Sequence, residues 1–366
     1  KIMIEKLTAE AIQLLKNLIE TPSFSSKEEK TAFLIETWMK NHEISYQRQH
    51  NNVWATNKNF DPAKPNLLLN SHHDTVQPNK AYTKDPFTAI EEDGKLYGLG
   101  SNDAGGCLVS LLAAFTYFYS HENLKYNLIV VASAEEESSG RNGLNSMLNV
   151  IPKIDVAIIG EPTLMNMAIA EKGLVVFDAV INGTPSHAAH PNDDNPIYKA
   201  IPILQNFKDF KFDKTSETLG DVKLTVTQIQ AGVQHNAVPS QVNLVIDVRV
   251  NDCYTNDEIV EILQNNFPDV SITPRSTRLN SSRISPEHPI VKAGMSLGRQ
   301  TYGSPTLSDQ SCLPCQSVKM GPGDTNRSHS ADEFIYINEL KEGINIYIDL
   351  LQETILNKKE TTKQAL

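Results

Sequence analysis

The chain has 366 residues, 40% of them hydrophobic, and a formal net charge of −11 at pH 7. This length is ample for a buried core and favours two domains, while the negative charge argues against nucleic acid and anionic membrane surfaces, which need basic patches. The four cysteines are too few for a disulfide scaffold.

The N-terminal region is predicted to form two amphipathic helices. Apolar residues recur at helical spacing from Ile12 to Ile19, and Ser26 and Glu29 are spaced as a capping box for the second helix. The first twenty residues have mixed charge and no continuous apolar core, so they do not resemble a signal peptide. No later run reaches about 18 uncharged apolar residues, so we expect a soluble cytoplasmic protein without a membrane span.

Three short apolar runs follow, at 66–70, 127–134 and 156–160. They are apolar on both faces and are separated by helical stretches, which predicts a parallel sheet buried between helices. Polar and acidic residues follow each run at once. Because ligands in open α/β sheets bind beyond the carboxyl ends of the strands, these residues are candidates for a site.

The pattern changes near Gly173, where apolar and polar residues begin to alternate as in half-exposed antiparallel strands. The predicted order β-α-β-β-α-β resembles a ferredoxin-like unit. The strands are expected at 174–182, 221–230, 241–250 and 269–275, with helices at 195–208 and 256–266. The predicted fold class is α/β: a mixed, mostly parallel sheet sandwiched by helices (1–172 and 284–366), with an inserted α+β ferredoxin-like domain (173–283).

The stretch "SHHDTV" ends the first apolar run. In a strand, residues i and i+2 share a face, so His72 and Asp74 point together and His73 points away. A metal-bound imidazole usually donates its other N–H to a carboxylate, which suits this pair. The alternative is a surface His–Asp pair.

Further acidic residues follow the other core elements. "YGLGSNDAGG" places Asp103 at a tight turn, where it could equally cap a helix. "SAEEESSG" has three consecutive carboxylates, which repel one another and are either solvated or relieved by a cation. "IIGEPT" ends a strand on Glu161, and the loop "GPGDTNRSHSADEF" supplies His329, which in isolation would be solvated. Together these residues form a ligand set for two divalent ions.

These motifs, with "GTPSHAAHP", resemble the M20 family of zinc aminoacylases and peptidases over nearly the whole chain. The branch that looks closest contains acetylornithine deacetylase and succinyl-diaminopimelate desuccinylase. The resemblance implies that His72 and Glu161 bind one zinc ion, that Glu137 and His329 bind the other, and that Asp103 bridges them. The resemblance also implies that Co²⁺ can substitute for Zn²⁺.

The resemblance also assigns the chemistry. Asp74 orients His72, and Glu136 is the general base that activates a water for attack on an acyl carbonyl. Glu135 fits the place of an acidic residue that usually precedes the Glu pair. A cis peptide bond is expected after the bridging residue, between Asp103 and Ala104.

Three residues of the predicted inserted domain match family positions near the substrate. His187, in "GTPSHAAHP", matches a histidine that reaches the active site of the partner subunit, although it could be an ordinary polar histidine. Asn236 and Arg249 match positions associated with the substrate carboxylate. Arg249 could equally be solvated beside Asp247. A homodimer through this domain is therefore expected.

The expected function is a dinuclear zinc amidohydrolase that removes an acetyl or succinyl group from a small N-acyl amino acid, first an N-acylornithine of arginine biosynthesis. Alternatives within the family are N-acetylcitrulline deacetylase, succinyl-diaminopimelate desuccinylase and dipeptidase. A non-catalytic relative that keeps the fold for binding is a different class, against which the intact ligands and Glu136 argue. The Cys-x-x-Cys pair Cys312 and Cys315 has no second pair, so we favour simple packing.

Overall fold

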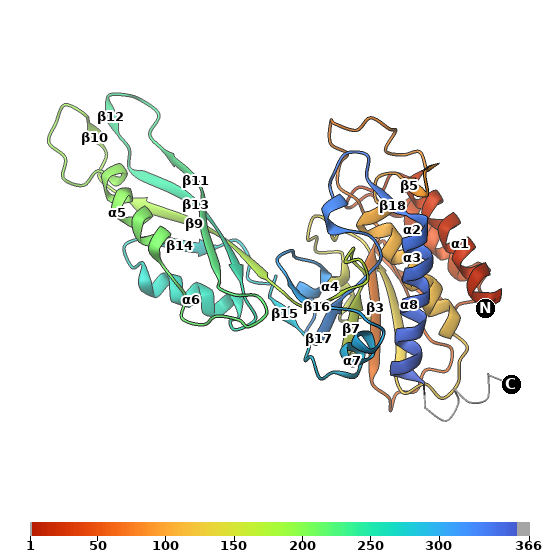
Figure 1. Ribbon diagram of the computed structural model, residues 1–366. Helices are drawn as coiled ribbons and strands as arrows, with labels where there is room; N and C mark the ends of the chain where they lie inside the picture. The colour runs from red at the N-terminus through yellow and green to blue at the C-terminus, as the bar shows by residue number, and fades with distance from the viewer. Residues whose placement is uncertain (1, 357–366) are drawn as a thin grey trace. The chain divides into compact units, whose positions relative to one another are not determined.

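A computed structural model describes residues 2–356 of the chain. Within this range the chain forms two compact units (Figure 1). The first contains 2–169, 283–302 and 308–356, and the second contains 170–282 and 303–307. No helix among the described residues is both long and apolar enough to cross a bilayer.

The first unit is built on a nine-stranded sheet with the order β1-β2-β6-β3-β7-β17-β8-β15, in which β16 also pairs with β8. Its central strands β6, β3, β7 and β17 are parallel, whereas β2 and β8 pair antiparallel with their neighbours β6 and β17. The strands are β1 (Tyr46–Gln49), β2 (Asn52–Thr56), β3 (Asn66–His72), β6 (Asn127–Ser133), β7 (Val156–Ile159), β8 (Met167–Glu171), β15 (Ser282–Arg283), β16 (Thr301–Ser304) and β17 (Gln316–Lys319). The predicted mixed, mostly parallel sheet is confirmed.

Helices cover both faces of this sheet because its central strands are apolar on both sides. Leu67 and Leu69 pack into the larger core with α1, α2, α3, α7 and α8, while Leu68 packs into a smaller core with α4. The helices are α1 (Ile2–Ile19), α2 (Glu29–Asn41), α3 (Gly106–Phe118), α4 (Leu144–Met147), α7 (Pro289–Ser296) and α8 (Ile337–Ile355). A small sheet has the order β18-β5-β4, from β4 (Ile90–Glu92), β5 (Lys95–Tyr97) and β18 (Phe334–Tyr336).

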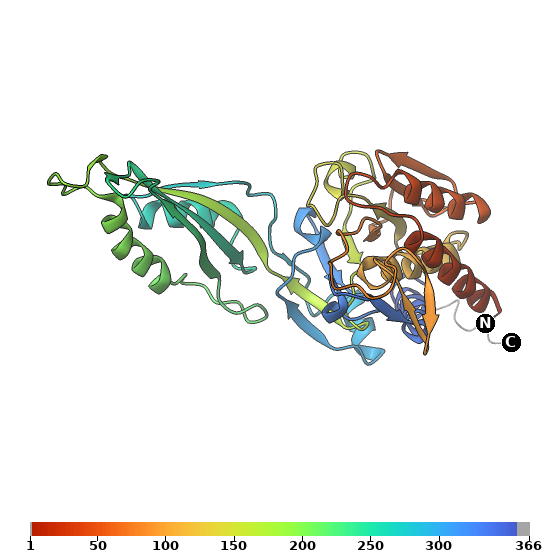
Figure 2. The same ribbon diagram turned by 90° about the horizontal axis from the view of Figure 1, so that it is seen from above.

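The second unit has a four-stranded antiparallel sheet with the order β11-β13-β9-β14. The helices α5 and α6 lie along one face of this sheet (Figure 2). Their side chains and those of alternate strand positions form one core, which explains the apolar–polar alternation. The elements are β9 (Gly173–Asn182), α5 (Pro196–Asp209), β11 (Lys223–Ala231), β13 (Gln241–Val250), α6 (Asn256–Asn266) and β14 (Ser271–Pro274). They follow the predicted β-α-β-β-α-β order. A separate pair joins β10 (Ser186–His187) to β12 (Ala237–Val238).

The capping box predicted at Ser26 and Glu29 is wrong. The N-cap of α2 is Glu28, and no side chain makes a cap hydrogen bond. Ser26 has a positive φ of 69°, and its hydroxyl donates instead to Glu135, 109 residues away. The local pattern predicted that the Ser26 side chain caps the helix, but this side chain makes a long-range hydrogen bond instead.

Candidate metal centre

The predicted ligands of the first unit converge at one edge of the sheet. His72 ends β3, 136–137 follow β6 closely, and Glu161 lies just beyond β7. Because β6, β3 and β7 are parallel neighbours, their carboxyl ends meet at the same edge. Asp103 joins them from the short helical turn η1 (Ser101–Gly105) before α3, and His329 joins them from the loop before β18.

The His72 imidazole lies at the centre of the carboxylates. Its Nε2 is 3.4 Å from Asp103 Oδ1, 3.6 Å from Glu161 Oε1 and 3.7 Å from Glu136 Oε2. This nitrogen is buried and has no hydrogen-bond partner. Two ligands of one tetrahedral zinc ion, each about 2.0–2.2 Å from it, stand roughly 3.3–3.6 Å apart. The spacing therefore fits a shared cation better than direct hydrogen bonds.

His329 faces the same aspartate from the other side. Its Nε2 is 3.0 Å from Glu137 Oε2 and 3.5 Å from Asp103 Oδ2. Asp103 thus presents one carboxylate oxygen to His72 and the other to His329. Such an arrangement suits a carboxylate that bridges two cations. Two groups, His72–Asp103–Glu137 and His72–Glu136–Glu161, have ligand atoms within 4.8 Å of one another.

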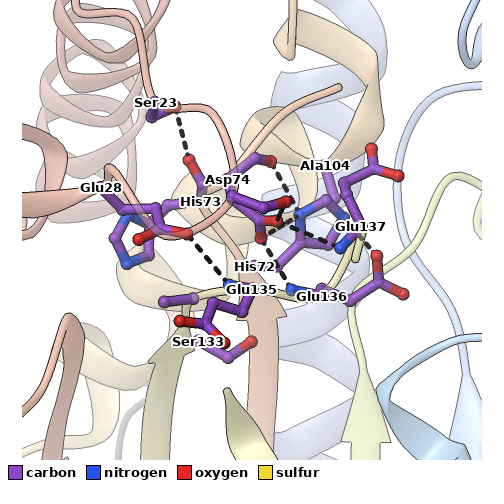
Figure 3. Close-up of polar contacts among 12 residues, drawn as sticks. Ser23, Glu28, His72, His73, Asp74, Ala104, Ser133, Glu135, Glu136 and Glu137 are labelled. Atoms are coloured by element: carbon purple, nitrogen blue, oxygen red, sulfur yellow. Dashed lines mark hydrogen bonds and ion pairs between the residues drawn. The ribbon is translucent and has the colours of Figure 1, made fainter. Parts of the chain in front are cut away.

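Asp74 is fully buried and contacts both the His72 imidazole and the turn that carries Glu136 and Glu137 (Figure 3). The His72 Nδ1 lies 3.4 Å from Asp74 Oδ1 but only 3.0 Å from the backbone oxygen of Asp74. The Asp74 carboxylate accepts the N–H groups of Glu136 (3.0 Å) and Glu137 (3.1 Å), and the Ser25 hydroxyl at 2.6 Å. Asp74 therefore positions the two glutamates as well as the imidazole.

His73 turns away from the cluster, as expected from its place in the strand. Its Nδ1 lies 2.8 Å from the Thr31 hydroxyl and its Nε2 lies 2.9 Å from the backbone oxygen of Asn51. Burial lowers the pKa of His73 to about 4, so this imidazole is neutral at pH 7.

The buried carboxylates of the cluster repel one another. Burial, reinforced by neighbouring carboxylates, raises the pKa of Glu136 well above its ordinary value and that of Glu161 to about 8. Burial would also raise the pKa of Asp103, but the close approach of the His72 imidazole, 3.4 Å away, lowers it. The hydrogen bond to Glu137 raises the pKa of His329 to about 9. Divalent cations would relieve this repulsion, so the residues fit a metal centre.

Sequence reasoning missed Glu333, which holds the turn that carries Asp103. Its buried carboxylate accepts the N–H groups of Gly100 (3.1 Å), Asn102 (2.9 Å) and Asp103 (2.8 Å). The only sequence signal is its position four residues after His329 in the same motif. The Asp103–Ala104 peptide bond is cis, which confirms that expectation.

The other three candidates belong to the second unit. His187 lies on β10, and the N–H of the next residue, Ala188, donates to the backbone oxygen of Asn236 at 2.9 Å, so the structure brings these segments together. Arg249 lies near the far end of β13. Its Nε and Nη2 donate to the two oxygens of Asp247 at 2.8 and 3.1 Å. The structure does not bring Arg249 to His187 and Asn236.

Comparison with known proteins identifies related sequences. A family model described as "Peptidase family M20/M25/M40" matches residues 68–353. Succinyl-diaminopimelate desuccinylase of Rickettsia canadensis is 26% identical over 386 residues, covering 95% of this chain and 100% of that protein. The protein of the same name from Pelagibacter ubique is 25% identical over 320 residues, covering 79% of this chain and 83% of its own.

Solved structures share the fold at low sequence identity. The aminopeptidase PepT from Bacillus cereus has a TM-score of 0.75 and 13% identity, covering 95% of this chain and 98% of its own. The YXEP protein of Bacillus subtilis, described as a dinuclear metal-binding peptidase, has a TM-score of 0.73 and 16% identity, with the same coverage.

Proposed function

The chain belongs to the peptidase family M20/M25/M40 and is a metal-dependent amidohydrolase, and from this premise we propose that it removes the acyl group from a small N-acyl amino acid with two zinc ions bound. One observation carries the proposal: Asp103 directs one oxygen to His72 and one to His329. In this assignment His72 and Glu161 hold one ion, Glu137 and His329 hold the other, and Asp103 bridges them. Co²⁺ would substitute for zinc at such a centre.

The proposed mechanism assigns Glu136 as the general base. When bound, the ions lower the pKa of water and polarise the acyl carbonyl. Glu136 accepts a proton from the attacking water and returns it to the leaving amine. The Asp74 carboxylate accepts the backbone N–H of Glu136 and so holds the backbone from which the base extends.

Residues 173–283 are proposed to form the dimer and to cover the substrate, with 1–172 and 284–366 as the catalytic domain. His187 of one subunit would donate to the tetrahedral oxyanion in the site of its partner. Asn236 and Arg249 would bind the substrate carboxylate, and Arg249 would then have to exchange Asp247 for the substrate. The family resemblance supports these roles, as does the exposed edge strand β11.

The proposed substrate is an N-acylornithine, acetyl or succinyl, within arginine biosynthesis in the cytoplasm. A second candidate is succinyl-diaminopimelate, which the names of the relatives from Rickettsia and Pelagibacter favour. N-acetylcitrulline and dipeptides are the remaining candidates of the family. Retention of all five ligands and of Glu136 supports an enzyme over a non-catalytic binding protein.

The test measures kcat/KM with metal-loaded protein. The panel contains N-acetylornithine, N-succinylornithine, N-acetylcitrulline, N-succinyl-diaminopimelate and a dipeptide. We expect an N-acylornithine to be the best substrate, a preference that rests on overall family resemblance. Between acetyl and succinyl, a site built to pair the distal succinyl carboxylate should reject the analogue lacking it by about 10⁴-fold. A lead of more than about tenfold for succinyl-diaminopimelate would establish the second candidate. Protein that binds two ions per chain but hydrolyses no compound would be a non-catalytic relative.

A further inference from the structure

We propose that Glu28 is a positioning residue that fixes the turn Glu135–Glu137 and thereby aims Glu136 and Glu137 at the metal centre. The inference rests on the proposed function, because it takes Glu136 as the base and Glu137 as a ligand. Glu28 lies in the N-terminal segment, more than a hundred residues before the turn.

Glu28 is completely buried, and its carboxylate accepts three hydrogen bonds. Its Oε1 accepts the N–H of Ser26 at 2.5 Å. The same oxygen accepts the N–H of Glu135 at 3.2 Å (Figure 3). Its Oε2 accepts the Asn51 side-chain amide at 2.9 Å. A buried carboxylate with three donors is held in one orientation and can therefore hold its partners in turn.

Three consecutive backbone N–H groups of the turn point to carboxylates. Glu28 accepts that of Glu135, and the two oxygens of Asp74 accept those of Glu136 and Glu137. Glu135 has a positive φ of 56°, a conformation that non-glycine residues adopt only when their surroundings hold it. Successive amides that converge in this way form an anion-binding concavity, and here two protein carboxylates occupy it.

The segment that carries Glu28 makes two further contacts, one with Asp74 and one with the turn. The Ser25 hydroxyl donates to Asp74 Oδ2 at 2.6 Å, and the Ser26 hydroxyl donates to Glu135 Oε1 at 3.1 Å. Because Glu28 also binds the Ser26 N–H, its loss would release this segment as well as the turn.

The obvious alternative role for Glu28 is to start α2, where it occupies the N-cap position. Its side chain makes no cap hydrogen bond, because its oxygens are used by Ser26, Glu135 and Asn51. The carboxylate therefore serves the acidic turn and not the helix. Its replacement should affect the chemistry of Glu136 more than the stability of α2.

The first test compares Glu28→Ala and Glu28→Gln with wild type at saturating zinc. A misplacement of the base by about 1 Å can cost about 10²-fold, so kcat should fall roughly 10- to 100-fold for Glu28→Ala, with KM little changed. Glu28→Gln keeps the size and one acceptor oxygen and should lose less. If the alanine variant does not fold, Glu28→Asp decides, because its carboxylate is one methylene too short to reach the Glu135 N–H, and an unchanged kcat in that variant overturns the proposal.

A matched control separates positioning from stability. Ile35→Val removes one methylene from a fully buried side chain of α2 and should lower the unfolding temperature without changing kcat. A second comparison adds Glu28→Ala to Glu136→Gln. If Glu28 acts through the base, it should cost little of the residual kcat in that background. An equal loss in both backgrounds, or a similar loss in Ile35→Val, overturns the proposal.

The final readout does not need activity. Amide hydrogen exchange over residues 133–139, followed by mass spectrometry, should be faster in Glu28→Ala than in wild type and unchanged in Ile35→Val. Unchanged exchange in the Glu28 variant overturns the positioning role. Wild-type protein that hydrolyses none of the panel compounds refutes the proposed function, and exchange still decides whether Glu28 fixes the turn.

Discussion

Three consecutive glutamates of one chemical type have three different surroundings in this site. The Glu135 carboxylate turns back onto its own loop, where it accepts the Asn142 N–H at 3.1 Å. The Glu136 carboxylate faces His72, and the Glu137 carboxylate faces His329. In the proposed mechanism, the direction of each side chain, set by the turn, would decide which glutamate is structural, which is the base and which is a ligand.

Glu136→Gln should abolish turnover and leave two metal ions per chain. The change removes the proton acceptor but keeps size and most hydrogen bonds, and loss of a general base typically costs about 10²–10⁴-fold in kcat. Glu137→Gln, the matched neighbour, should instead lose metal. Elemental analysis with kcat measurement checks both. Near-native kcat in Glu136→Gln would show that another group is the base.

Cys315 should react slowly with iodoacetamide at pH 7 to 8. Burial raises its thiol pKa to about 11, so the reactive thiolate is scarce below that pH. Labelling should accelerate as pH rises toward 11 and should be much faster at pH 8 in urea-unfolded protein, where the pKa returns to about 8.5. Peptide mass spectrometry measures the rate. Rapid labelling of the folded protein at pH 7 would indicate a reactive motif in place of a packing role.

At the scale of elements, the capping-box spacing forms a cap at one helix, α6, and not at another, α2. In α6, the Thr255 hydroxyl accepts the N–H of Glu258, whose carboxylate accepts the Thr255 N–H, so the capping box forms. Ser26 and Glu29 have the same spacing, but the Ser26 hydroxyl donates to Glu135. A local rule holds where the side chains have no stronger distant partner.

Thr255→Ala should destabilise the second unit by about 1 kcal/mol, because an N-cap hydroxyl contributes that much to a helix. Thr255→Ser keeps the hydroxyl and is the control. Urea denaturation followed by circular dichroism measures the change. An equal loss in the serine variant would mean that the threonine methyl, and not the cap bond, matters.

This contrast indicates what the sequence can predict. Two-sided apolar patterns predicted three central strands of the first unit, β3, β6 and β7, and period-two patterns predicted the four-stranded sheet of the second. The carboxyl ends of the three parallel strands placed His72, 136–137 and Glu161 together. The role of Glu333 was not predictable, because a carboxylate that binds three backbone amides leaves no pattern in its own neighbourhood. Glu28 was missed for the same reason: its partner is far along the chain.

At the scale of the whole molecule, metal removal should both inactivate and destabilise the protein. Without cations the carboxylates of the cluster repel one another in a buried site, and any ion that binds only the folded state stabilises it by mass action. We expect two ions per chain by elemental analysis, loss of activity on exhaustive chelation, a lower unfolding temperature and recovery with Zn²⁺ or Co²⁺. Full activity without metal would exclude the dinuclear mechanism.

The proposed dimer predicts complementation between inactive subunits. If His187 acts in the partner's site, then mixing His187→Ala with Glu136→Gln should restore activity after subunit exchange. Each mixed dimer would contain one site with an intact base and an intact His187. Exchange is verified with differently tagged chains, and mixing each variant with itself is the control. No recovery despite proven exchange would place His187 outside the partner's site.

The sheet order has a consequence for biosynthesis. β17 lies between β7 and β8 in the finished sheet, yet it is made about 150 residues after them, once the second unit has been synthesised. Until then β7 has an open edge of unpaired amides and carbonyls in an apolar strand, which is a template for aggregation. The growing chain therefore passes through a long vulnerable interval, and translation speed and chaperone supply should set the yield of folded enzyme.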